Sequence, residues 1–195
     1  MLGLIIGVIG TVVVYPSTTK TSPNMMGAKS VQNSDILDAH FIEQMIPHHE
    51  DAITMARLAQ TKAQRPEIKT LADSIISSQG KEIAQMKDWY KAWFGRDLPT
   101  GQQVMQHHGM MSSSSSMHMG MMGTDQDEES LSNAADFDTT FLEDMIPHHQ
   151  MAVMMASMLK DGTQRPEMKK LADDIIAAQT SEINQMRSWL TEWSK

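Results

Sequence analysis

The sequence contains no cysteine. This absence excludes disulfide bonds, thiolate zinc sites, iron–sulfur clusters and thiol nucleophiles. Basic residues are also few, because 16 Lys and Arg stand against 24 Asp and Glu and give a formal net charge of −8. This balance argues against a nucleic-acid-binding protein, since the phosphate backbone is bound by clustered Lys and Arg. A chain of 195 residues has room for one domain or two small ones.

Uncharged apolar residues form one run near the N-terminus. Residues 2–15 (LGLIIGVIGTVVVY) carry no charge and end at Pro16, so the run is shorter than the roughly 20 residues that a membrane-spanning helix needs. It is typical of the apolar part of a secretory signal, although no basic residue precedes it. We expect a periplasmic or secreted protein, with an uncleaved membrane anchor or a buried strand as the alternatives. Residues 17–33 are rich in Ser, Thr, Asn and Gly and predict a disordered spacer, so that 1–33 form a signal and spacer segment.

The remainder of the chain contains an internal repeat. Residues 41–94 align with residues 141–194 at an offset of 100 without a gap, and 27 of the 54 positions are identical. FIEQMIPHHEDAITMA stands against FLEDMIPHHQMAVMMA, and QRPEIKTLADSIISSQ stands against QRPEMKKLADDIIAAQ. Two copies of one structural unit are therefore expected, over 34–95 and 136–195.

Each copy has the pattern of a helical hairpin. Apolar residues recur at the helical period, and Ser34 is a plausible N-cap of the first helix. Pro47 kinks that helix or, alternatively, starts a new one. Pro66 with Glu67 predicts the start of the second helix, and Gly95 predicts its C-cap. Because a lone hairpin cannot bury its apolar faces, we predict an all-α fold in which the two hairpins pack as one four-helix bundle.

Residues 96–135 link the two copies and are rich in Met and His. Residues 105–122 include seven Met and three His but no Leu, Ile or Phe, so these Met residues have no core to fill. Thioethers select Cu(I), imidazole suits copper in either oxidation state, and an oxidising compartment disfavours thiolate ligands. We predict copper binding here, with a low-complexity tract that binds nothing as the alternative. The candidate ligands are Met105, His107, His108, Met110, Met111, Met117, His118, Met119, Met121 and Met122.

The MIPHH motif places imidazoles and thioethers on one helix face in both copies. At 100° per residue, the two adjacent His flank the apolar stripe, with Met within one or two turns of them. A metal site is the favoured interpretation, and a hydrogen-bonded His pair that frames the Pro kink is the alternative. The candidate ligands are Met45, His48, His49 and Met55 in the first copy, and Met145, His148, His149, Met151, Met155 and Met158 in the second.

Polar residues interrupt the apolar stripe of the second helix in each copy. Gln79 and Glu82 lie within 40° of Ile75, and Gln179 and Glu182 repeat this arrangement. A carboxylate that faces a bundle needs a partner. We expect His48 or His49 to supply it, as a hydrogen bond or a shared metal site. Escape of the carboxylate to solvent is the alternative.

These residues carry a resemblance to a known family. The block FxxxMIPHHxxAxxMA, followed by LAxxII, QxxEIxxM and a terminal Trp pair, resembles a bacterial family known only as a domain of unknown function. Members of that family are similar to ferritin-like bundles, tend to be exported, and include Met/His-rich periplasmic copper-binding proteins of cyanobacteria. The resemblance implies copper binding, with silver as a mimic, and copper resistance by sequestration outside the cytoplasm.

Two classes of function follow. The first is a non-enzymatic binding protein that holds Cu(I), and also Cu(II), and exchanges it with a copper exporter or another periplasmic copper protein. The second is a ferritin-like di-metal oxidase that uses Glu82 and Glu182 with the His pairs, although the chain lacks the Glu-x-x-His motif of such enzymes. We expect no nucleic-acid partner, and membrane contact only through an uncleaved N-terminal segment.

Overall fold

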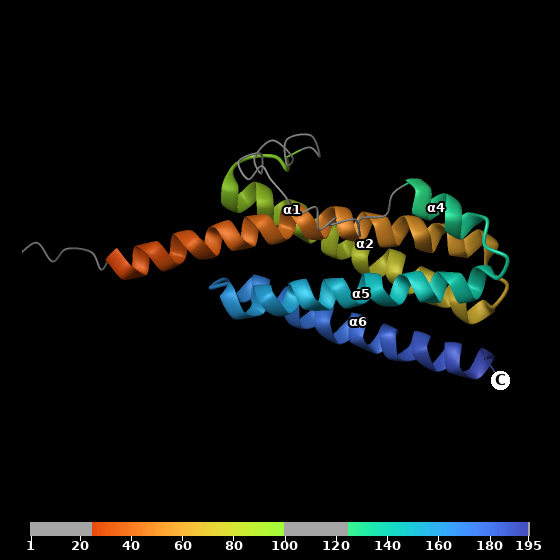
Figure 1. Ribbon diagram of the computed structural model, residues 1–195. Coiled ribbons are helices and arrows are strands. Elements are labelled where there is room, and N and C mark those ends of the chain that lie inside the picture. The colour runs from red at the N-terminus through yellow and green to blue at the C-terminus, as the bar shows by residue number, and fades with distance from the viewer. Residues whose placement is uncertain (1–24, 100–124, 195) are drawn as a thin grey trace, which may run out of the picture.

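The computed structural model describes residues 25–99 and 125–194, and within these ranges the chain is helical and has no strand. The helices are α1 (Met25–Lys62), α2 (Pro66–Phe94), α4 (Asp125–Ser132), α5 (Phe137–Gly162) and α6 (Pro166–Trp193). Figure 1 shows two long hairpins, α1–α2 and α5–α6, with α1 lying along α5. The predicted all-α bundle of two hairpins is confirmed.

The ends of the second helix in each hairpin follow local sequence signals. Pro66 and Pro166 occupy the first turn, where the missing N–H removes no helical hydrogen bond, and Glu67 and Glu167 add negative charge there. Gly95 ends α2 in the left-handed conformation (φ 64°), and its N–H donates to Lys91 O at 3.0 Å. A residue with a Cβ is strained at this φ, so glycine suits the position.

The prolines of the MIPHH motifs lie inside continuous helices. Pro47 is within α1 and Pro147 is within α5. The alternative of a helix break at Pro47 is therefore wrong. A proline removes only one backbone hydrogen bond, whereas the residues on both sides of it, Met45 and His48 in α1, are anchored by burial in the bundle.

Two helical segments were not predicted. Helix α1 begins at Met25, so the expected spacer over 17–33 is wrong from Met25 onward, and Ser34 is not an N-cap. The buried Ser34 hydroxyl instead accepts a hydrogen bond from the Gln164 N–H at 2.8 Å. Helix α4 lies within the predicted linker, where Leu131 is buried and Lys62 Nζ donates to Ser132 O at 2.6 Å. One apolar anchor and one tertiary hydrogen bond hold a segment whose composition alone indicates a loop.

The core joins the two copies into one body. Its residues form two clusters, and each cluster takes side chains from both hairpins. Phe41 and Ile42 of α1 belong to the same cluster as Leu159 of α5, while Phe141 and Leu142 of α5 belong to the other cluster with Ala59 of α1. Residues of the first copy thus occupy places in one cluster that the matching residues of the second copy occupy in the other cluster. This arrangement is the one that a pseudo-twofold axis between α1 and α5 produces.

Equivalent ion pairs close the two ends of the bundle. Asp138, which is 1% exposed, accepts the Gln64 and Arg65 N–H groups at 3.0 and 2.9 Å and pairs with Arg65 Nη1 at 3.3 Å. At the other end the buried Asp38 pairs with Arg165 Nε at 3.2 Å. Burial raises the pKa of Asp38, against the lowering effects of the Thr163 hydroxyl and Arg165. Each hairpin connection is thus held by an aspartate of the other copy.

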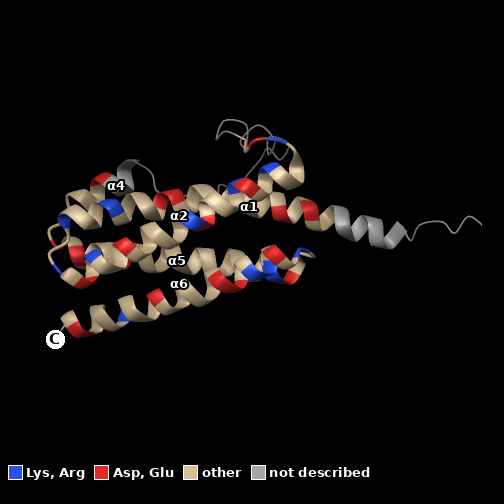
Figure 2. Cartoon of the chain, turned by 180° about the vertical axis from the view of Figure 1, so that it is seen from behind, with Lys and Arg blue, Asp and Glu red and all other residues tan. Residues whose placement is uncertain are grey.

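Charge is distributed over the outer surface. Figure 2 shows Lys and Arg interspersed with Asp and Glu along the helices rather than gathered on one of them. Across residues 25–99 and 125–194, none of the helices combines the length and apolar character required to cross a bilayer. The apolar run at residues 2–15 lies outside the described residues.

Candidate metal centre

A pair of imidazoles from different copies meets at the centre of the bundle. The rings of His48 (α1) and His148 (α5) lie 3.8 Å apart between centroids, tilted by 44°. The residues are 3% and 8% exposed. The two residues are 100 positions apart in the sequence, so the pseudo-twofold axis passes between the two rings.

Both imidazoles of this pair are neutral at physiological pH. Burial, reinforced by repulsion from His148, His49 and His149, lowers the pKa of His48 to about 2. Burial also lowers the pKa of His148, although the nearby Asp51 carboxylate opposes the shift. Neutral imidazole has a free lone pair and is the form that binds metal ions, so no proton has to be displaced from these rings near pH 7.

The second histidine of each motif is held by a carboxylate. His49 Nε2 lies 2.7 Å from Glu82 Oε2, and His149 Nε2 lies 2.7 Å from Glu182 Oε2. An ionised carboxylate only accepts hydrogen bonds, so Nε2 carries the proton and the lone pair remains on Nδ1. Metal-binding histidines commonly donate their other N–H to a carboxylate in this way. The prediction that Glu82 faces His48 or His49 is confirmed for His49, and escape of Glu82 to solvent is wrong.

Several polar atoms around these histidines have no hydrogen-bond partner within the described part of the chain. They are both ring nitrogens of His48 and His148, Nδ1 of His49 and His149, Oε1 of Gln79, and both amide atoms of Gln179. Buried polar groups without partners are costly, and six such atoms on the four histidines of the motifs need an explanation such as water or an ion. Their donor types, imidazole nitrogen above all, fit a late transition metal.

Asp51 gives the His48–His148 pair a carboxylate on one side only. Asp51 Oδ2 lies 3.6 Å from His148 Nε2, and the Asp51 side chain is 20% exposed. The residue at the equivalent place in the second copy is Met151. Met151 is among the ligands predicted from the sequence and Asp51 is not, because an aspartate on a helix flank has no sequence signal that distinguishes it from a solvated charge.

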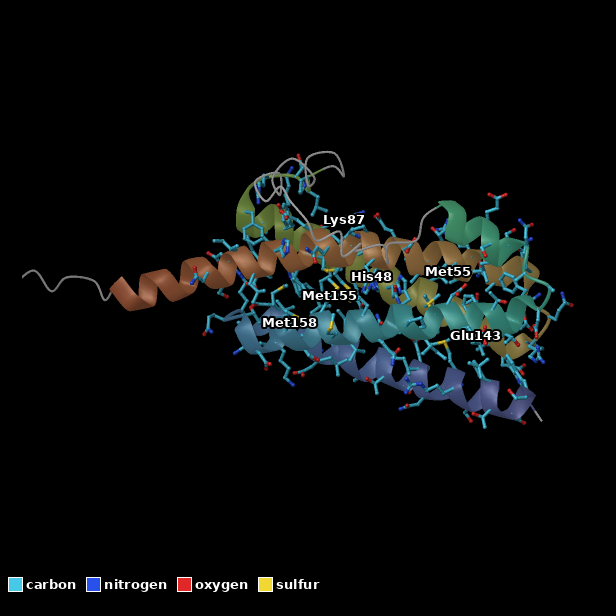
Figure 3. All side chains as sticks on the ribbon, viewed as in Figure 1. His48, Met55, Lys87, Glu143, Met155 and Met158 are labelled. Atoms are coloured by element: carbon cyan, nitrogen blue, oxygen red, sulfur yellow. The ribbon has the colours of Figure 1, made fainter. Side chains whose placement is uncertain are left out.

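The methionines of the motif fall into three groups. Met45 and Met145 are fully buried and belong to opposite core clusters, which supplies them with a packing role. Met55 and Met155 are partly buried against the clusters. Met158 is 65% exposed. In Figure 3, Met158, Met155, His48 and Met55 follow one another along the boundary between α1 and α5.

The structure thus brings together only part of the predicted ligand set. The candidate ligands from Met105 to Met122 lie outside the described residues. Among residues 25–99 and 125–194, no three His, Asp or Glu side chains converge as a ready metal site. A metal centre in this bundle therefore has to combine the imidazoles with thioethers, or draw its ligands together when the ion binds.

Comparisons with known proteins agree with this fold and motif. A family model described as "Domain of unknown function (DUF305)" matches residues 38–190. A structure of CopM in the Cu(II)-bound form is 48% identical, with a TM-score of 0.69 over 80% of this chain and 97% of that chain. CopM structures in Cu(I)-bound and Ag-bound forms are each 47% identical, with a TM-score of 0.67 over 81% of this chain and 98% of theirs.

Two more distant matches extend the comparison. A DUF305 fragment from Deinococcus radiodurans is 26% identical, with a TM-score of 0.65 over 80% of this chain and 96% of that chain. Uncharacterized protein L153 of Acanthamoeba polyphaga mimivirus is 47% identical over 55 residues, which are 28% of this chain and 36% of that protein. The match thus spans about a third of that relative's length. Since the family model covers most of the sequence, from residue 38 to residue 190, the chain belongs to the DUF305 family.

Proposed function

We propose that this protein binds copper, and that it buffers the ion outside the cytoplasm through Met/His sites on the bundle and on the linker. The observation that carries the proposal is the His48–His148 pair, buried, neutral and without hydrogen-bond partners in the described chain. Thioethers of Met55, Met155 and Met158 border the same helix boundary. The solved CopM structures in copper-bound and silver-bound forms, at nearly half identity, support copper binding.

The division of labour follows from the two kinds of site. The linker, with seven Met and three His among residues 105–122, collects Cu(I) by ligand exchange. The histidines of the bundle hold copper more selectively, because His49 and His149 are oriented by Glu82 and Glu182. Export through the N-terminal apolar segment, copper resistance, and transfer to an exporter or another periplasmic protein complete the proposal.

The protein acts as a binding protein in this proposal. A ferritin-like di-metal oxidase would gather its carboxylates and histidines around two ions. Glu82 and Glu182 each bind a separate histidine instead. Within the described ranges no triad of His, Asp or Glu is assembled, so no observation favours the oxidase.

A titration with Cu(I) in competition with a chelator tests the proposal. The full chain is compared with a variant that lacks residues 105–122 and with the double variant His48→Gln/His148→Gln. We expect the full chain to bind several equivalents of Cu(I) tightly. Each of the two variants should bind fewer equivalents but should still retain some. The variant His40→Gln is the control, because His40 lies outside the pair and bonds to Gln44.

Two results would contradict the proposal. If the full chain binds no copper more tightly than the chelator does, the protein is not a copper buffer. If the double variant retains all the copper of the parent, the bundle has no site at the His48–His148 pair.

A further inference from the structure

The two copies place equivalent residues in equivalent environments throughout the bundle. The bonds His49–Glu82 and His149–Glu182 have the same length of 2.7 Å. The side chain of Arg65 stacks on Trp193 at 3.9 Å, and that of Arg165 stacks on Trp93 at 4.4 Å. Positions 100 residues apart are therefore related by the pseudo-twofold axis, and a difference in residue type between them is a chemical difference between two matching places.

Such a difference occurs beside the central histidine pair. Asp51 of α1 stands 3.6 Å from the Nε2 atom of His148. The pseudo-twofold axis places Met151 of α5 on the corresponding side of His48. One imidazole therefore has a carboxylate as its neighbour, whereas the position that corresponds to Asp51 in the other copy is a partly buried methionine.

We propose that this asymmetry fits the centre to both oxidation states of copper, with Asp51 a ligand of Cu(II) beside His148 and Met151 a ligand of Cu(I) beside His48. The inference rests on the proposed function and adds Asp51 to its ligands. Carboxylate oxygen is a hard donor and suits Cu(II), while thioether sulfur is a soft donor and suits Cu(I). Imidazole suits both, which lets the adjoining rings of His48 and His148 serve either ion.

The distance between Asp51 and His148 is compatible with two ligands of one metal ion. A separation of 3.6 Å between Nε2 and Oδ2 is too long for an N–H···O bond. Two ligand atoms at about 2.1 Å from one ion, about 120° apart, are separated by about 3.6 Å. The Asp51 side chain is 20% exposed, so water has access to complete the coordination of Cu(II). Cu(I) accepts a low coordination number and needs fewer donors than Cu(II).

Single and swapped variants of the full chain test the inference. Asp51→Asn should lower Cu(II) affinity about tenfold or more while leaving Cu(I) affinity nearly unchanged, and Met151→Leu should do the converse. Occupancy is read from the ¹⁵N signals of His48 and His148, which separate this centre from the linker sites. The matched controls are Glu50→Gln, an exposed carboxylate paired with Lys87 at 3.0 Å, and Met154→Leu, an exposed thioether on α5.

The swapped variants predict a gain as well as a loss. Asp51→Met should strengthen Cu(I) binding and weaken Cu(II) binding, and Met151→Asp should have the opposite effect. If the variants change Cu(I) and Cu(II) affinity equally, or change them no more than the controls do, the asymmetry has no role in copper selection. If copper leaves the His48 and His148 signals of the parent chain unchanged, the proposed bundle site itself fails, which is a separate result.

Discussion

Acid should destabilise the copper-free protein through His48, and the size of the effect follows from its burial. The pKa of this imidazole is about 2 in the folded chain, against about 6.5 in an unfolded chain. Between these values the unfolded state binds one more proton than the native state, so the free energy of unfolding rises with pH and is lost as the pH falls below 6.5. From pH 6.5 to pH 4.5, His48 alone lowers the free energy of unfolding by about 2 kcal/mol.

Urea unfolding of the chain at several pH values, with chelators present to keep it free of metal, measures this effect. The parent is compared with His48→Gln, which cannot titrate, so that carboxylate titrations common to both chains cancel in the difference. The difference in slope should be about 1.4 kcal/mol per pH unit, equivalent to one proton. Coincident transitions by circular dichroism and tryptophan fluorescence verify two-state unfolding. Equal slopes in parent and variant would refute the reasoning, because His48 would then be protonated or solvated in the native state.

Three further predictions concern the ends of the bundle and its copper. Asp138→Ala should lower the free energy of unfolding by about 3 kcal/mol, because it removes a buried carboxylate that binds two backbone N–H groups and Arg65, and urea unfolding at pH 7 measures the loss. Arg65→Lys should lower the free energy of unfolding by about 1 kcal/mol in the same assay, because lysine lacks the planar guanidinium that stacks on Trp193. An unchanged midpoint would contradict this prediction. Copper bound by the linker histidines His107, His108 and His118 should be released between about pH 7 and pH 5. Copper bound by Met alone should persist over this range, and so should copper bound at His48, whose pKa in the folded chain is about 2. Uniform loss of copper in a chelator titration would disprove that division.

Much of the fold could be predicted because the controlling interactions are local. Pro66 with Glu67 and the left-handed Gly95 mark helix ends within one turn of sequence. The partner of Glu82 was predictable for a similar reason, since a carboxylate inside an apolar stripe must bond to something on the facing helix.

Other features depend on how the two copies meet, which helical periodicity does not encode. The pattern of the MIPHH motif shows that His48 faces inward but not that His148 of the other copy covers it. The sequence likewise indicates that Asp138 is an acidic residue in the first turn of α5. It does not indicate that Asp138 binds the backbone of the connection that follows α1. Helix α4 was missed because its support, the burial of Leu131 and the bond from Lys62, comes from outside the segment.

The location of the histidine pair on the pseudo-twofold axis has an evolutionary consequence. A single hairpin could build the same centre only by pairing with an identical chain, as in a symmetric homodimer. In such a dimer, every substitution beside the centre appears twice, so both imidazoles always have the same neighbour. Two hairpins within one chain are free of this constraint, so position 51 can be aspartate while position 151 is methionine.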